Sequence, residues 1–154
     1  MAAMKIRTAL PADAGALLLM MRELARFEDY LRHFCVTEAD LLERGLDPDG
    51  LRQFTALVAE RDDGVLAGYA LVYTVPYTYD LRPNLMLKEL YVSAGARNTG
   101  VGHALMTAVI ELGRRLGCAR LKWDVLASNA PAQAFYRALG GGHDARWQGW
   151  LLAV

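Results

Sequence analysis

The sequence predicts an α/β fold built on a mixed sheet, and two observations support this prediction. Strand-like apolar runs alternate with segments whose apolar residues recur every three or four positions, the spacing of one helix face. A strand, a glycine-containing turn and a long helix follow one another over residues 87–118 and form the centre of this pattern. Because 54% of the 154 residues are hydrophobic, the chain can build one sizeable core, and we expect a single domain over residues 1–154.

The N-terminal half is expected to hold a strand, two helices and an antiparallel hairpin. Residues 4–9 alternate as a strand, and Pro11 then starts a helix that ends near Phe27. Thr37 and Asp40 resemble a capping box, which predicts a short helix through about residue 46. The hairpin consists of a strand at 54–60, a tight turn at 61–64 and a second strand at 65–75.

The C-terminal half continues the alternation. After a loop at residues 76–84, the apolar run at 87–92 is the expected central strand, and the helix that follows it ends at Gly117. The remaining elements are expected to be a strand at 120–126, a helix from Asn129 to the glycine run at 140–142, and a final strand at 146–154.

Charge and cysteine usage narrow the class of protein. Seventeen basic and 17 acidic side chains cancel, so nothing favours a nucleic-acid or anionic membrane surface as a partner. Cys35 and Cys118 lie far apart in the sequence, which is typical of reduced thiols in a cytoplasmic protein. No apolar run approaches the roughly 20 residues that span a bilayer, and the three histidines lack metal-ligand spacing. We therefore expect a cytoplasmic protein without a metal.

The turn between the central strand and its helix is suited to an anion. Arg97 precedes Gly100 and Gly102 at the predicted start of the helix. The first helical turn leaves N–H groups unpartnered, glycines let a diphosphate approach closely, and the arginine adds a forked cation. Neither a Walker loop nor a dinucleotide fingerprint fits, the latter because Leu105 replaces its third glycine. By itself the segment is compatible with a pyrophosphate site or with an ordinary strand-to-helix turn.

This turn and a second segment resemble two signatures of one superfamily. The run RNTGVG at residues 97–102 resembles the acetyl-coenzyme A signature of the GCN5-related N-acetyltransferases, and NAPAQAFY at residues 129–136 is similar to their second signature. Within that superfamily the chain most resembles the diamine (spermidine/spermine-type) acetyltransferases, over nearly its whole length. The resemblance implies a GNAT fold with a mostly antiparallel sheet and splayed central strands, and acetyl-coenzyme A as cosubstrate. It also implies a homodimer, for which the final strand is a candidate pairing surface.

The resemblance assigns roles to particular residues. Tyr136 would stand near the thioester sulfur, and backbone amides of the central turn would hold the pyrophosphate. The positions expected to bind the cofactor are Leu90, Tyr91, Val92, Arg97, Asn98, Thr99, Gly100, Val101, Gly102, His103 and Asn129. The positions expected at the acceptor amine are Phe27, Glu28, Tyr79, Lys88 and Asp124.

One departure from the family pattern concerns the acceptor. The diamine enzymes carry two adjacent acidic residues before the Leu-Tyr-Val run, whereas this chain has Lys88 followed by Glu89. A lysine that faces the acceptor pocket would repel an ammonium and could hold a carboxylate, which favours an amino-acid-like acceptor. Polyamines and diamines stay open as alternatives.

Amide formation from an ammonium and a thioester requires a general base and a general acid. An alkylammonium has a pKa of about 10.4, so its nitrogen must lose a proton before it attacks a thioester. Glu89 is the leading candidate to receive that proton, followed by Asp124, Glu28 and Tyr79; each could instead be a solvated or ion-paired group. Tyr136 can protonate the leaving thiolate.

The expected function is therefore acetyl-coenzyme A-dependent N-acetylation of a primary amine in a small molecule. Two alternatives stay open at this point: acetylation of a protein or peptide amine, and a coenzyme A-binding module without catalysis.

Overall fold

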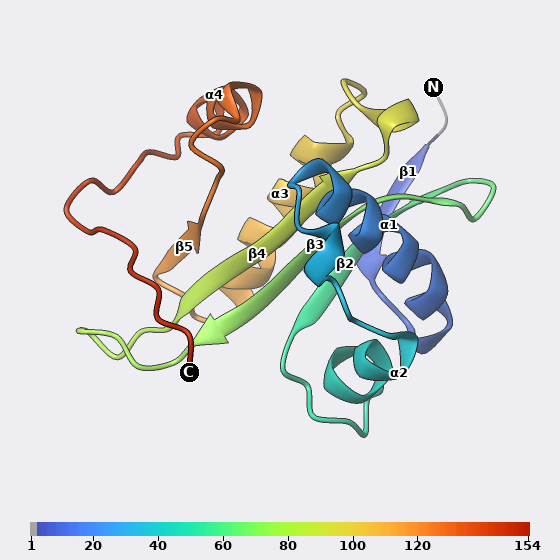
Figure 1. The fold of residues 1–154 in the computed structure, drawn as a ribbon, viewed down its shortest axis with the longest axis horizontal. Coiled ribbons are helices and arrows are strands. Elements are labelled where there is room, and N and C mark those ends of the chain that lie inside the picture. Colours follow the sequence, from blue (N-terminus) through green and yellow to red (C-terminus); the bar gives the residue numbers. More distant parts are fainter. Residues whose placement is uncertain (1–2) are drawn as a thin grey trace. The chain divides into compact units, whose positions relative to one another are not determined.

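The computed structural model describes residues 3–154. Contacts divide the chain into two compact units, a larger one that ends at Asp124 and a smaller one that begins at Val125. The larger unit contains a sheet of five strands in the spatial order β1-β2-β3-β4-β5 (Figure 1). The strands are β1 (Met4–Thr8), β2 (Thr55–Arg61), β3 (Leu66–Val75), β4 (Asn84–Val92) and β5 (Arg120–Trp123). The first four pair antiparallel and β5 pairs parallel with β4, which confirms the predicted mixed, mostly antiparallel sheet.

Two long helices cover opposite faces of this sheet. One is α1 (Ala14–Phe27), in blue in Figure 1, and the other is α3 (Val101–Arg115), in orange behind the sheet. The core on the α1 side joins Leu17 and Met21 to Val58, Tyr69 and other inward residues of β2 and β3. Alternate residues of the same strands face α3, as expected for the two-residue period of a strand. Along a regular stretch of strand, successive residues therefore face different helices.

Shorter helical turns connect these elements. The chain passes from α1 through a turn at Leu31–His33 to α2 (Glu38–Leu41), which continues as a π-helical turn at Leu42–Leu46. The predicted capping box at α2 is confirmed, because Thr37 Oγ1 accepts from the Asp40 N–H at 3.2 Å and Asp40 Oδ2 accepts from the Thr37 N–H at 2.8 Å. Pro11–Asp13 and Ala94–Ala96 form single 3-10 turns before α1 and α3.

An ion-pair cluster joins the first strand to the start of α1. Arg7 on β1 donates to both carboxylate oxygens of Asp13, at 2.7 and 3.0 Å, and to Glu60 on β2 at 2.7 Å. Asp13 also accepts from the backbone N–H of Leu10 at 2.7 Å. These side chains are largely shielded from solvent, so the cluster holds the β1–α1 connection against β2.

The smaller unit, residues 125–154, contains one helix, α4 (Ala130–Ala138). Asn129 caps it, since its side-chain oxygen accepts from the Ala132 N–H at 3.1 Å, which agrees with the predicted helix start. The final strand predicted at 146–154 is wrong, because the structure has no strand in that segment. A strand requires a neighbour that completes its hydrogen bonds, and Trp147 and Trp150 are instead 72% and 90% exposed. The fifth strand also ends three residues earlier than the expected 120–126.

Candidate functional site

A register shift in β4 determines which way the candidate catalytic carboxylate points. Leu87 pairs with Val72 of β3, and Glu89 pairs with the adjacent Leu71, so Lys88 is an extra residue in β4. Such a β-bulge breaks the two-residue alternation of a strand. Without it, Glu89 would share the α3 side with Leu87; with it, Glu89 lies on the α1 side. The bulge therefore directs Glu89 toward the end of α1.

Glu89 and Lys88 line a pocket together with two residues that follow α1. The pocket has a volume of about 330 Å³ and is lined by Glu28, Tyr30, Lys88 and Glu89. Two carboxylates and one ammonium thus share a small space with a phenol. The structure brings together three predicted residues, Glu28, Lys88 and Glu89, that are up to 61 positions apart in the sequence (89 − 28).

A buried tyrosine holds one of these carboxylates. Tyr69 of β3 donates its hydroxyl hydrogen to Glu89 Oε2 at 2.7 Å, and its side chain is fully buried. Sequence reasoning missed both Tyr69 and Tyr30 as site residues. The antiparallel pairing of β3 with β4 was predictable, but the bulge that puts Glu89 on the same face of the sheet as Tyr69 carries no local sequence signal.

Burial raises the pKa of each acidic side chain that lines the pocket. Loss of water raises the pKa of Glu89, while the hydrogen bond from Tyr69 and the charge of Lys88 act in the opposite direction. Burial likewise raises the pKa of Glu28, again opposed by Lys88. The pKa of Tyr30 rises to about 12 through burial and the nearby charges of Glu89 and Glu28. The Tyr69 pKa rises far above its usual range, so this phenol keeps its proton.

The predicted cofactor turn has the backbone shape that an anion site needs. Gly100 precedes α3 at φ +91° and Asn98 lies at φ +61°, so the chain turns sharply into the helix. A side chain added at Gly100 would meet nothing within 4 Å, which leaves open space in front of the first turn of α3. The first turn of an α-helix leaves N–H groups without partners inside the helix, and such groups can bind an anion. The turn thus fits a diphosphate.

Arg97, in the turn before α3, contacts the end of α1 and the end of β4. Its Nε donates to the Val92 carbonyl oxygen at 3.0 Å. Its guanidinium carbon lies 5.9 Å from the ring centroids of both Phe27 and Tyr91. The side chain is therefore oriented by the end of α1 and the end of β4 at once.

Pairing between β4 and the edge strand β5 stops before β4 reaches this turn. Pairing between β4 and β5 covers Asn84–Leu87 and Arg120–Trp123, and β4 then continues to Val92 without β5 beside it. This is the splay expected from the resemblance. β5 does not pair with residues 88–92 of β4, and this side of the strand suits an extended ligand such as the amide-bearing arm of a coenzyme.

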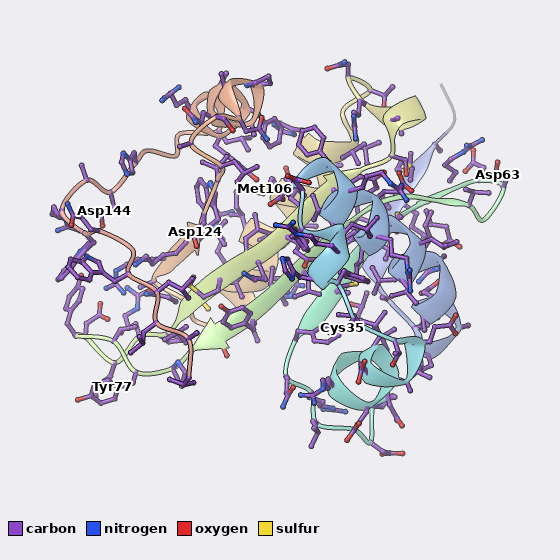
Figure 2. The ribbon with its side chains drawn as sticks, viewed as in Figure 1. Cys35, Asp63, Tyr77, Met106, Asp124 and Asp144 are labelled. Atoms are coloured by element: carbon purple, nitrogen blue, oxygen red, sulfur yellow. The ribbon has the colours of Figure 1, made fainter. Side chains whose placement is uncertain are left out.

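Other predicted residues lie elsewhere in the larger unit. The ring of Tyr79 lies 4.4 Å from the guanidinium carbon of Arg120, in the loop between β3 and β4, and does not line the pocket. Asp80 of the same loop binds Arg120, and Tyr77 points outward from it (Figure 2). Asp124 follows directly after β5 and is exposed (Figure 2). The roles given to Tyr79 and Asp124 stay predictions.

Tyr136 and Asn129 belong to the smaller unit. Tyr136 lies on α4, where its ring packs edge-on against Phe135 with centroids 5.4 Å apart. The amide oxygen of Asn129 is engaged in capping α4. Their roles in catalysis and cofactor binding also stay predictions. Within residues 3–154 no three His, Cys, Asp or Glu side chains are grouped to hold a metal ion.

Residues 18–140 match the profile of the Acetyltransferase (GNAT) family. This range includes the glycine turn before α3 and the bulge beside Glu89. The chain belongs to the GNAT family of acetyltransferases. The predicted family and enzyme class are thus confirmed. Across residues 3–154, no helix of this acetyltransferase has both the length and the apolar character to cross a membrane.

Relatives are similar in sequence to nearly the whole of this acetyltransferase. It is 32% identical to a thialysine N-epsilon-acetyltransferase of Mus musculus, which covers 98% of this chain and 91% of that protein. It is 27% identical to the spermidine/spermine N(1)-acetyltransferase-like protein 1 of Homo sapiens, over 96% of this chain and 22% of that protein. An aminoglycoside N-acetyltransferase solved in complex with CoA shares the fold, with a TM-score of 0.76 and 21% identity over 100% of this chain and 97% of that chain.

Proposed function

We propose that this acetyltransferase transfers the acetyl group of acetyl-coenzyme A directly to the side-chain amine of a small, amino-acid-like molecule. The observation that carries the proposal is the pocket in which Glu28 and Glu89 lie with Lys88. Two carboxylates attract an ammonium, and one ammonium attracts a carboxylate. An acceptor with an amine at one end and a carboxylate at the other matches both.

The relatives support an acceptor of this kind. Thialysine, named for the Mus musculus relative, is an amino acid with an amine at the end of its side chain. The spermidine/spermine relative is named for polyamines, which have no carboxylate. Because Lys88 would repel one of the ammonium groups of a polyamine, the charge of the pocket favours the amino-acid-like acceptor.

Glu89 is proposed to receive the proton of the acceptor ammonium. The nitrogen then forms a bond to the acetyl carbon as the carbon–sulfur bond breaks. Negative charge that develops on the acetyl oxygen can be stabilised by a backbone N–H of β4 near the bulge. Tyr136 is proposed to give its proton to the departing sulfur. The nitrogen loses its second proton to water as the amide forms, and exchange with water then returns a proton to Tyr136 and removes one from Glu89, so that one proton is released in each turnover.

The cofactor is proposed to bind along the splayed edge of β4 and the turn before α3. Backbone N–H groups from Asn98 to His103 would hold its pyrophosphate, with the side chain of Arg97 beside them. Leu90, Tyr91 and Val92 would lie along its amide-bearing arm. When bound, acetyl-coenzyme A supplies the activated acetyl group.

A matched panel of acceptors tests the proposal. Lysine and cadaverine differ only by the α-carboxylate, as do ornithine and putrescine, so each pair isolates the contribution of Lys88. Thiol release from acetyl-coenzyme A should show a kcat/KM about 10-fold higher for each amino acid than for its diamine. Mass spectrometry of the product should place the acetyl group on the side-chain nitrogen.

Three results would contradict the proposal. Equal kcat/KM values for the amino acid and the diamine of each pair would show that Lys88 does not contact the α-carboxylate. A clear preference for lysine-containing peptides over free lysine would favour a protein acceptor. Calorimetric binding of acetyl-coenzyme A without turnover of any amine would indicate a binding module without catalysis.

We also propose that the protein works in the cytoplasm as a homodimer. Both cysteines are free thiols, which suits a reducing compartment. In the smaller unit Trp147, Trp150 and Leu151 are 72%, 90% and 100% exposed, an apolar surface that a second copy would cover. Sedimentation equilibrium should give about twice the chain mass of 17.0 kDa; a monomer mass at micromolar concentration would contradict the dimer.

A further inference from the structure

We propose that Tyr69 is a positioning residue for catalysis, because its hydroxyl fixes the Glu89 carboxylate with Oε1 turned to the acceptor amine. This inference rests on the function proposed above, in which Glu89 is the base. Tyr69 touches neither substrate in that arrangement. It acts through Glu89, by occupying Oε2 with a hydrogen bond of 2.7 Å.

The surroundings of Tyr69 make it a rigid support. Its side chain is fully buried in the core between the sheet and α1. The ring of Tyr91 on the neighbouring strand packs against it, with centroids 6.0 Å apart. A buried phenol requires a hydrogen-bond partner, and Glu89 provides it. The hydroxyl therefore has one position, and the carboxylate that it contacts is held with it.

The bulge at Lys88 explains why such a support is needed. The extra residue loosens the pairing of β4 with β3 at the point where Glu89 must point into the pocket. A glutamate side chain has three rotatable bonds, so burial alone does not orient its carboxylate. The hydrogen bond from Tyr69, on the strand next to β4, supplies the missing constraint. A base held in one orientation meets the acceptor more often in a productive geometry.

The same hydrogen bond favours the ionised form of Glu89 and opposes the rise in its pKa caused by burial. Burial and the nearby Glu28 favour its protonated form, whereas Tyr69 and Lys88 favour the carboxylate. Tyr30, whose pKa is also raised, stays neutral near pH 7 and adds no charge. Since Tyr69 stays protonated as well, it donates to Glu89 and does not compete for the proton of the amine. Loss of the hydroxyl should thus raise the pKa of Glu89 further.

The test is Tyr69→Phe in the full chain, which removes one oxygen from a buried ring. Carbon-13 NMR of glutamate carboxyls, with Glu89→Gln to assign the signal, follows the titration of Glu89 without any turnover. We expect its midpoint to rise by about one pH unit. At pH 7 kcat should fall about 10-fold while the KM for acetyl-coenzyme A is unchanged. Tyr73→Phe removes a hydroxyl from the same strand, outside the pocket, and should change neither quantity.

A double variant separates positioning from a general effect on the fold. In the Glu89→Gln background, Tyr69→Phe should cause no further loss of kcat, because the residue through which it acts is gone. An equal loss in both backgrounds, or an unchanged titration of Glu89, would overturn the role of Tyr69. If Glu89→Gln keeps wild-type turnover, the base assignment fails and the inference fails with it. If Glu89→Gln is inactive and Tyr69→Phe is fully active, only the inference fails.

Discussion

The guanidinium of Arg97 lies over the ring of Phe27, 5.9 Å from its centroid. The two residues come from the turn before α3 and the end of α1, so the contact links the proposed coenzyme site to the proposed acceptor site. Arg97 is further held by the Val92 carbonyl. A substitution of Phe27 should therefore change the binding of both coenzyme A and the acceptor.

Phe27→Leu should weaken coenzyme A binding about threefold, because leucine lacks the electron-rich face that attracts the Arg97 guanidinium. The KM of the acceptor should rise in parallel. Calorimetry with coenzyme A and steady-state kinetics measure the two effects. Phe34→Leu is a suitable control, since it removes a similar contact with Arg22 at 5.7 Å, and it should leave coenzyme A affinity unchanged. Unaltered affinity in Phe27→Leu would show that Arg97 needs no support from this ring.

Gly100→Asp should weaken coenzyme A binding about 10-fold by setting a carboxylate against the diphosphate at the start of α3. Gly64→Asp provides a matched control. Gly64 has φ +80° against +91° for Gly100, and a side chain at either position meets nothing within 4 Å. Both variants should lose about 1 kcal/mol of stability from the left-handed backbone. Equal coenzyme A affinities in the two would contradict a pyrophosphate site at Gly100.

Lys88→Glu should move the acceptor preference from lysine toward spermidine. The substitution replaces the cation expected to hold a carboxylate by an anion that attracts a second ammonium. The ratio of kcat/KM values for the two acceptors should change roughly 10-fold. Lys5→Glu on β1 makes the same change in net charge away from the pocket. An unchanged ratio in Lys88→Glu, or an equal change in Lys5→Glu, would separate Lys88 from acceptor choice.

Tyr136→Phe should lower kcat about 100-fold with little change in coenzyme A affinity, because it removes the proposed proton donor to the departing thiolate. Tyr77→Phe removes a hydroxyl from a tyrosine that is 83% exposed, and it should be fully active. Rapid-quench measurement of the first turnover distinguishes slower chemistry from slower product release. Wild-type turnover in Tyr136→Phe would exclude this phenol from the mechanism.

Arg7→Met should lower the free energy of unfolding by about 1–2 kcal/mol at pH 7, because it breaks the shielded pair with Asp13. The pair with Arg7 holds the pKa of Asp13 and of Glu60 below their usual values. A lowered carboxyl pKa stabilises the fold at higher pH, and this contribution is lost as pH falls through the folded-state pKa. The difference from wild type should thus be greatest above about pH 5 and shrink below about pH 4.

Urea titrations between pH 3 and 7 measure this dependence. Arg61→Met is the control, since Arg61 and Asp63 are 47% and 51% exposed, and its effect should stay below about 0.5 kcal/mol. A pH-independent difference for Arg7→Met would show that packing, not the ion pairs, accounts for its contribution.

Features that depend on a few neighbouring residues were predictable from the sequence. The capping box of Thr37, the cap at Asn129 and the turn at Gly100 each rest on hydrogen bonds or dihedral preferences within one or two turns of chain. The hairpin of β2 and β3 follows from alternation on either side of a tight turn. The prediction of a final strand at 146–154 was wrong because it rested on a local apolar pattern. Strand formation also requires a partner strand, which that pattern does not specify.

The sequence by itself thus determined the order of the elements as far as α4, the glycine turn before α3 and the membership of the acetyltransferase family. Only the tertiary structure decided that Glu89 turns to the α1 side, that Tyr69 holds it, and that Glu28 and Lys88 share its pocket. The physical reason is that local patterns record short-range hydrogen bonds and burial periodicity. The register between β3 and β4 depends instead on how both faces of the sheet pack, and a single extra residue at Lys88 reverses which face Glu89 occupies.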